Sequence, residues 1–233
     1  GADAGSDGSV CADGTYELDG EVTHSTDYFW STAGDGTFDD TTVLDAMYAP
    51  GSNDAQNGQV TLTLTANAMP PCQIDAISSM TLIVLDTQKV SLFKGWNSLS
   101  SNLSPINQNN NNLLFGSILS NLVLVYNFEG TFWPDQGTNN LMWDVESGYV
   151  VKLEADDEMI FCGDHLASLI VNLDTAWNLI PVLSETDVDV TSVFDASVDV
   201  KLVLEVAGWK LFWPDYNINT IVNLEVGKSY FAF

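Results

Sequence analysis

The sequence contains no arginine, and its six basic residues are all lysines. Against them stand 32 acidic residues, so the formal net charge is −26 at pH 7. The first lysine is Lys89, which leaves residues 1–88 with no basic side chain to pair with their acids. Such a surface repels nucleic acids and anionic lipids, and we predict no nucleic-acid partner. Because molar salt screens charges beyond about 3 Å, the composition favours a saline or alkaline extracellular environment.

Long apolar runs and catalytic motifs are also missing. No stretch of about 20 apolar residues occurs, which predicts that no segment spans a membrane. His24 and His165 are the only histidines, and there is no Gly-x-Ser-x-Gly, His-Glu-x-x-His or phosphate-loop motif. Pairs of acidic residues are the machinery of glycoside hydrolases, but a chain this acidic contains such pairs by composition alone. We therefore predict that the protein is not an enzyme.

Only three cysteines are present, so one of them is left over after a single disulfide forms. We predict a bond between Cys11 and Cys72, because both fall in the same predicted domain, near its two ends. Cys162 is predicted to be a small buried apolar residue rather than a reactive thiol.

The sequence is rich in the period-two alternation that is typical of strands. Residues 58–66 alternate apolar residues with threonines, and residues 198–206 alternate in a similar way. Residues 122–128 are apolar on both faces, as a central strand is, and the β-branched end of residues 76–84 favours a strand over a helix. Residues 106–112 are asparagine-rich and predict a polar loop. The predicted fold class is all-β.

Residues 1–86 form the first predicted domain. Its landmarks follow in the order Cys11, Trp30-Ser31-Thr32, Gly34-Asp35-Gly36-Thr37-Phe38, Tyr48-Ala49-Pro50, residues 60–66 and Pro71-Cys72. This order resembles the immunoglobulin-like, PKD-like domains that are repeated in large secreted bacterial surface proteins. The resemblance implies an immunoglobulin-like β-sandwich that serves as a spacer or adhesive module, outside a bacterial cell or on its surface.

Residues 87–233 carry an internal repeat of about 80 residues. Its landmarks are Phe-Trp-Pro-Asp at 132–135 and 212–215, Trp96-Asn97 and Trp177-Asn178, and Gly148, Tyr149 and Gly227, Tyr230. We predict a C-terminal β domain whose repeats, 87–165 and 166–233, pack on each other. The region resembles repeats found beside immunoglobulin-like modules in secreted bacterial proteins. Since tryptophans at fixed repeat positions are usually packing anchors, the predicted repeat core is Trp96, Trp133, Trp177, Trp213, Tyr149 and Tyr230.

The Phe-Trp-Pro-Asp string allows two interpretations. In the first, Phe and Trp end a strand on alternate faces, Pro134 stops the ladder because it has no N–H, and Asp135 begins a turn. In the second, exposed aromatic rings form a platform on which a sugar ring stacks. The best candidates for that second role are Trp143 and Trp209, because they break the repeat and are not needed for a shared core.

Two acidic clusters are candidate calcium sites. Their carboxylates are Asp35, Asp39, Asp40, Asp156, Asp157 and Glu158. Calcium takes oxygen ligands from such side chains and from loop carbonyls, but neither cluster has the spacing of an EF-hand. The alternative is that both clusters are solvated turns of an acidic protein. No other cofactor is predicted.

The sequence favours a secreted structural protein, either a subunit of an extracellular filament or surface assembly or an adhesin. Its predicted partners are copies of itself, joined head to tail by strand addition, with residues 1–10 as the free segment that pairs with a neighbouring sheet edge. The alternative hypothesis is a carbohydrate-binding β-sandwich module of a secreted protein, with surface glycans as partners. A glycoside hydrolase is the third hypothesis.

Overall fold

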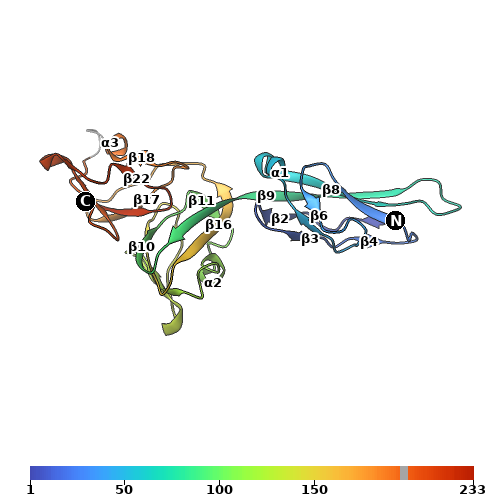
Figure 1. Ribbon diagram of the computed structural model, residues 1–233, viewed down its shortest axis with the longest axis horizontal. Coiled ribbons are helices and arrows are strands. Elements are labelled where there is room, and N and C mark those ends of the chain that lie inside the picture. The colour runs from blue at the N-terminus through green and yellow to red at the C-terminus, as the bar shows by residue number, and fades with distance from the viewer. Residues whose placement is uncertain (195–198) are drawn as a thin grey trace. The chain divides into compact units, whose positions relative to one another are not determined.

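The computed structural model describes residues 1–194 and 199–233, which fold as two compact units (Figure 1). Unit 1 is Gly1–Thr87 and unit 2 is Gln88–Phe233, so the boundary lies one residue from the predicted one. The predicted all-β class is confirmed. The described helices are short: α1 (Ser52–Asn57), α2 (Asn111–Leu114), α3 (Val190–Val193) and the 3-10 turns η1 (Pro134–Gln136) and η2 (Pro214–Tyr216).

The main sheet of unit 1 is built on a long antiparallel hairpin. Its strands are β8 (Gln59–Ala66) and β9 (Ala76–Leu92), which pair from Ala66↔Ala76 to Gln59↔Ile83. β5 (Tyr28–Thr32) pairs with the other edge of β8. Along β8 the apolar residues Val60, Leu62 and Leu64 are buried while the threonines between them face outward, because successive side chains of a strand point to opposite faces.

A second layer closes the core of unit 1. It is a three-stranded sheet in the order β3 (Tyr16–Glu17), β7 (Met47–Ala49) and β6 (Thr37–Phe38). Trp30 of β5, Tyr48 of β7 and Leu82 of β9 are all fully buried in one cluster. Apolar faces of both sheets therefore meet in a single core.

The N-terminal segment pairs inside its own unit. β1 (Ala2–Asp3) pairs with β4 (Glu21–Val22), and β2 (Gly8–Cys11) runs parallel to residues 82–85 of β9. The prediction that residues 1–10 are free to join a neighbouring copy is therefore wrong. The segment's few side chains gave no sign of its partner, because main-chain hydrogen bonds hold it.

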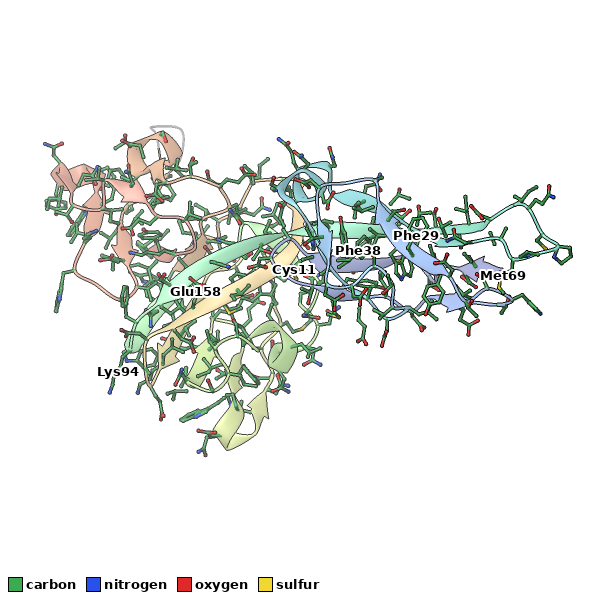
Figure 2. All side chains as sticks on the ribbon, turned by 45° about the vertical axis from the view of Figure 1, so that its right-hand side comes forward. Cys11, Phe29, Phe38, Met69, Lys94 and Glu158 are labelled. Carbon is green, nitrogen blue, oxygen red and sulfur yellow. The ribbon has the colours of Figure 1, made fainter. Side chains whose placement is uncertain are left out.

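The predicted Cys11–Cys72 disulfide is also wrong. Cys72 carries a free, exposed thiol on the loop between β8 and β9, close in sequence to Met69 (Figure 2). Cys11 lies opposite Leu85, which is nine steps along β9 from Ala76, a span of about 30 Å. A disulfide needs its two Cα atoms within about 7 Å. The disulfide-bonded cysteines are Cys11 and Cys162, so Cys162 is not the buried apolar residue that was expected.

Unit 2 contains two five-stranded sheets with the same strand order. The first runs β10 (Gly95–Leu99), β15 (Tyr149–Leu153), β12 (Leu122–Tyr126), β13 (Thr131–Trp133), β14 (Thr138–Asn139). The second runs β17 (Asn178–Pro181), β23 (Ser229–Ala232), β19 (Val203–Glu205), β20 (Leu211–Trp213), β21 (Ile218–Asn219). β12, the predicted central strand, is third of five in its sheet.

The two halves of unit 2 contact each other through backbone and hydroxyl groups. The Gly148 N–H donates to the Leu179 carbonyl at 2.7 Å, and the Ser100 N–H donates to the Gly227 carbonyl at 2.9 Å. The buried Ser229 hydroxyl donates to the Tyr149 carbonyl at 2.9 Å. Both glycines of the repeat therefore lie at the junction between the halves, and a Cβ on Gly148 would stand only 2.4 Å from that of Ser229.

The remaining strands of unit 2 form smaller pairings. β11 (Leu103–Pro105) pairs with β16 (Asp157–His165), which lies next to β9, and β18 (Val188–Asp189) pairs with β22 (Asn223–Leu224). The strand predicted at 198–206 is shorter, since β19 covers only Val203–Glu205, and residue 198 lies outside the described residues. The predicted loop at 106–112 ends in α2, where the N–H groups of Asn112 and Leu113 donate to the Asn110 side chain.

Candidate functional site

The Trp-Asn pair of each half forms the same turn. The Asn97 side-chain amide donates to the carbonyls of Phe93 and Gly95 and accepts from the Phe93 N–H. Asn178 repeats this pattern with Asp174 and Ala176. Since the asparagine closes the turn, the neighbouring tryptophan is left at the surface. Trp96 is 50% exposed and Trp177 is 43% exposed.

The Phe-Trp-Pro-Asp string is a strand end followed by a 3-10 turn in both halves. Phe132 and Phe212 are buried, and the proline after each tryptophan begins η1 or η2. Trp133 is exposed and Trp213 is half-buried against Tyr216, with 4.3 Å between ring centroids. The prediction that the four repeat tryptophans are core residues is therefore wrong for Trp96, Trp133, Trp177 and Trp213.

Tyr149 and Tyr230 do belong to the cores of the two halves. Each is buried, and each phenol oxygen accepts a backbone N–H five residues earlier, from Asp144 at 2.6 Å and from Glu225 at 2.9 Å. Burial raises the pKa of Tyr230 to about 12 and raises that of Tyr149 as well. Both residues anchor the loop that precedes their own strand.

Four aromatic rings, Phe128 of the first half and Trp177, Phe231 and Phe233 of the second, form a continuous surface that we call the aromatic row. Ring centroids lie 6.1 Å apart from Phe128 to Phe231, 6.4 Å from Phe231 to Trp177 and 5.1 Å from Trp177 to Phe233. Tyr230 and Ala232 point into the core, so Phe231 and Phe233 face outward by the alternation of the strand. Phe128, Trp177 and Phe233 are all exposed.

The first half has no such row, although its backbone is equivalent. In the pairing of β10 with β15, Trp96 lies opposite Lys152. In the second half Asn178 pairs with Ala232, so the preceding Trp177 lies near Phe233, the residue after Ala232. The Lys152 ammonium stands 5.1 Å from the centre of the Trp96 ring. Phe233 thus takes the place that a lysine holds in the first half. The two tryptophans therefore have equivalent backbone positions and different neighbouring side chains.

A depression of about 330 Å³ lies beside the aromatic row. Phe128 and Trp177 line it together with four acidic residues, Glu129, Asp144, Glu146 and Asp174. Within the described residues, the carboxylates of Glu129, Glu146 and Asp174 make no hydrogen bond or ion pair. A second depression, of about 610 Å³, is lined by Val171, Asp174, Lys201 and Phe233 among others, so the two depressions share Val171 and Asp174.

The two tryptophans predicted as stacking platforms differ sharply. Trp143 is 8% exposed and stacks on Tyr149 with 4.3 Å between ring centroids, so it belongs to the core and that prediction is wrong. Trp209 is 98% exposed on the turn between β19 and β20, where a ligand could reach it. The sequence signal for Trp143, its absence from the second repeat, reflects a core that differs between the halves.

The acidic residues of unit 1 organise turns. The Asp35 carboxylate accepts the N–H groups of Asn53 and Asp54 at the start of α1, and these bonds lower its pKa. Asp39 accepts the Met47 N–H, and Asp40 accepts both the N–H and the hydroxyl of Thr42. These carboxylates accept hydrogen bonds from backbone N–H groups, which fits the alternative that the cluster forms solvated turns.

The second acidic cluster is likewise committed in part. Asp156 accepts the Lys94 N–H, and Asp157 accepts a hydrogen bond from the Asn121 side-chain amide. Across residues 1–194 and 199–233, no group of three or more His, Cys, Asp or Glu side chains is arranged to hold a metal ion. The calcium sites predicted from Asp35, Asp39, Asp40, Asp156, Asp157 and Glu158 are therefore not assembled.

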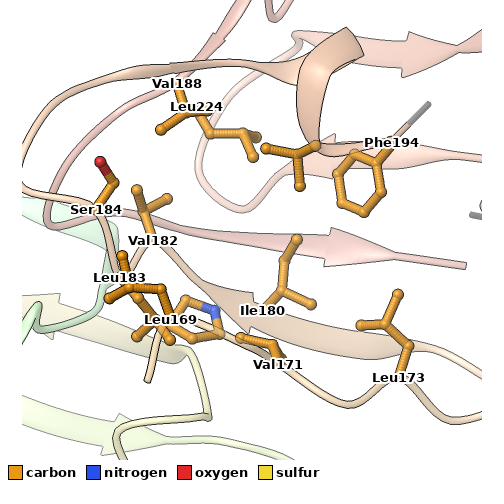
Figure 3. A pocket seen from close by; sticks show the side chains of 12 residues that line it. Leu169, Val171, Leu173, Ile180, Val182, Leu183, Ser184, Val188, Phe194 and Leu224 are labelled. Carbon is orange, nitrogen blue, oxygen red and sulfur yellow. The ribbon is translucent and has the colours of Figure 1, made fainter. Parts of the chain in front are cut away.

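An apolar pocket of about 420 Å³ opens in the second half (Figure 3). Leucine, valine and isoleucine side chains line it, from residues 169–173, from 180–183 and from Val188 and Leu224, with Phe194 at one end. It is separate in character from the acidic depression because Ser184 is its one polar side chain among the lining residues.

None of the helices in the described part of the chain has the length and hydrophobicity that a membrane span requires. A scan against protein-family models finds no match for this chain, and a search of curated proteins also finds none. The class of protein is therefore defined by its own structure: an all-β protein that carries an acid-rimmed aromatic surface on its C-terminal unit.

Proposed function

We propose that the chain is an adhesive protein of an extracellular surface that binds glycans through the aromatic row. The observation that carries this is the row itself: Phe128, Phe231, Trp177 and Phe233, with two adjoining depressions beside it. Apolar faces of sugar rings pack on aromatic rings, and nearby carboxylates and amides accept hydrogen bonds from sugar hydroxyls. A row of rings fits an extended oligosaccharide better than a single sugar.

Two features support the extracellular location that this function requires. The disulfide-bonded Cys11 and Cys162 indicate an oxidising compartment, and a net charge of −26 keeps a protein dispersed in salt. Unit 1, whose two packed sheets fit the immunoglobulin-like resemblance, serves in this proposal as the spacer that presents unit 2.

The test is binding to a panel of polysaccharides, which is measured by electrophoresis in polysaccharide gels and by quenching of tryptophan fluorescence. Trp177→Ala should weaken binding about tenfold, since it removes the central ring of the row. Trp96→Ala is the matched control, because Trp96 occupies the equivalent turn with similar exposure. Equal losses in both variants, or no binding to any polysaccharide, would contradict the proposal.

The second candidate function is a subunit of a filament or surface assembly. The apolar pocket favours it, because a monomer leaves the pocket's lining in water, including Leu169, which is 62% exposed. Copies this acidic cannot attract each other through charge, so apolar contact would have to join them, and the occupant would be another copy of this chain. Sedimentation in molar NaCl should then show polymers that Leu169→Asp dissolves. Monomers at every salt concentration would argue against assembly.

A further inference from the structure

We propose that the depression beside Trp177 selects glycans that carry a protonated amine, such as glucosamine oligomers. This inference rests on the proposed glycan binding and names the class of ligand. Three uncommitted carboxylates, Glu129, Glu146 and Asp174, line one depression with the Trp177 ring, and none of the residues around it is basic. An ammonium group placed there gains attraction from the carboxylates and from the ring face.

The first half of unit 2 shows an ammonium group beside the equivalent tryptophan. There the chain supplies its own ammonium, because Lys152 lies over the Trp96 ring. The depression beside Trp96, of about 360 Å³, is lined by Lys89 and Lys228 together with Glu205. In the second half the residue equivalent to Lys152 is Phe233. The depression beside Trp177 is lined by carboxylates where the depression beside Trp96 is lined by Lys89 and Lys228. In the first half the depression thus contains lysines of the chain itself, whereas in the second half the carboxylates of the depression are left without a basic residue among its lining.

The charge of the ligand follows from this arrangement. A uronic acid would bring a further carboxylate next to three others, so like charges would repel it. A neutral sugar would keep the ring contacts and hydrogen bonds alone. An amine-bearing sugar would add charge-assisted hydrogen bonds, which are shorter and stronger than neutral ones. Salt should weaken this preference, because it screens exposed charges.

The experiment compares three oligosaccharides of equal length by calorimetry with the full chain: glucosamine, N-acetylglucosamine and galacturonate oligomers. We expect the glucosamine oligomer to bind about tenfold more tightly than the acetylated one at a pH where its amine is protonated. The galacturonate oligomer should not bind. The double variant Glu129→Gln, Asp174→Asn should bring the two glucosamine-based ligands to equal affinity.

A matched control separates the site from general attraction of a cation to an acidic protein. The double variant Glu17→Gln, Asp45→Asn also removes two negative charges, but from exposed positions in unit 1, and it should leave the tenfold preference intact. Loss of the preference in this control would overturn the inference. If the acetylated oligomer binds as tightly as the amine through Trp177, the inference fails while glycan binding stands. If no oligomer binds, the inference fails, and the proposed glycan binding fails with it only if the polysaccharide panel also shows no binding.

Discussion

At the scale of single residues, Asp54 shows how unit 1, which has no lysine or arginine, can bury a carboxylate. It is 1% exposed, and its oxygens accept the Tyr48 hydroxyl at 2.6 Å and the N–H groups of Gly36 and Gly51 at 3.1 and 3.0 Å. Four donors, counting the Asp35 N–H at 3.3 Å, replace the water that the carboxylate loses. The side chain therefore ties the start of α1 to β7 and to the loop after β5.

Asp54→Asn should destabilise unit 1 by about 2–4 kcal/mol, because the amide offers N–H groups to donors that need an acceptor. Urea unfolding followed by tryptophan fluorescence measures this, since Trp30 lies in the same core. Asp45→Asn, at an exposed position, should change stability by less than about 0.5 kcal/mol. Equal effects of the two substitutions would contradict the structural role of Asp54.

Buried phenols make stability depend on alkaline pH. Burial, followed by the hydrogen bond to Asp54, raises the pKa of Tyr48 to about 12, and burial raises that of Tyr230 to about 12. Unfolded tyrosine ionises near pH 10, so these phenols stabilise the fold fully below about pH 10. We expect stability to fall between about pH 10 and about pH 12, as the unfolded chain loses protons that the folded chain keeps. Constant stability across this window would contradict the burial.

At the scale of elements, the turn after Phe-Trp-Pro-Asp is built twice with different residues. η1 ends at Gly137 with φ of 66°, and η2 ends at Asn217 with φ of 54°. Both lie in the left-handed region, which glycine and asparagine tolerate best. A Cβ on Gly137 would meet nothing within 4 Å, so the backbone conformation alone restricts this position.

Gly137→Val should therefore cost about 1–2 kcal/mol, the penalty of a β-branched residue in the left-handed region. Gly137→Asn, which copies the second half, should cost less than about 1 kcal/mol. Thermal unfolding of the two variants provides the comparison. A valine variant as stable as the asparagine variant would show that the turn relaxes into another conformation.

At the scale of the whole molecule, charge dominates. The chain carries 26 more negative than positive charges, and the ion pairs that the structure describes involve few of its 32 acids. Self-repulsion in the compact state falls as salt screens it.

The melting temperature should rise from low salt to molar NaCl. Potassium chloride should act as sodium chloride does, because screening depends on ionic strength. Millimolar calcium should have little effect, since the described acidic clusters form no group that holds a metal. A melting temperature that is flat with NaCl, or that rises with calcium alone, would contradict this account.

The sequence by itself determined the elements that depend on neighbours along the chain. The alternation in 58–66 gave β8, the apolar run at 122–128 gave β12, and Pro and Asp after Phe-Trp gave the 3-10 turns. Such patterns succeed because side-chain direction in a strand and the missing N–H of proline are local properties. Tyr149 and Tyr230 were found in the same way, from fixed positions in the repeat.

Only the tertiary structure decided which residues meet and which stay in water. Cys72 has no nearby cysteine because a hairpin carries it away from Cys11, and Trp143 is buried because Phe161 and Tyr149 cover it. Trp177 joins Phe128, Phe231 and Phe233 from three separate parts of the chain, so no local pattern could reveal the aromatic row. Exposure depends on which residues from the rest of the chain pack over a side chain. Two copies of a repeat can therefore place a side chain at the same backbone position while different residues pack over it.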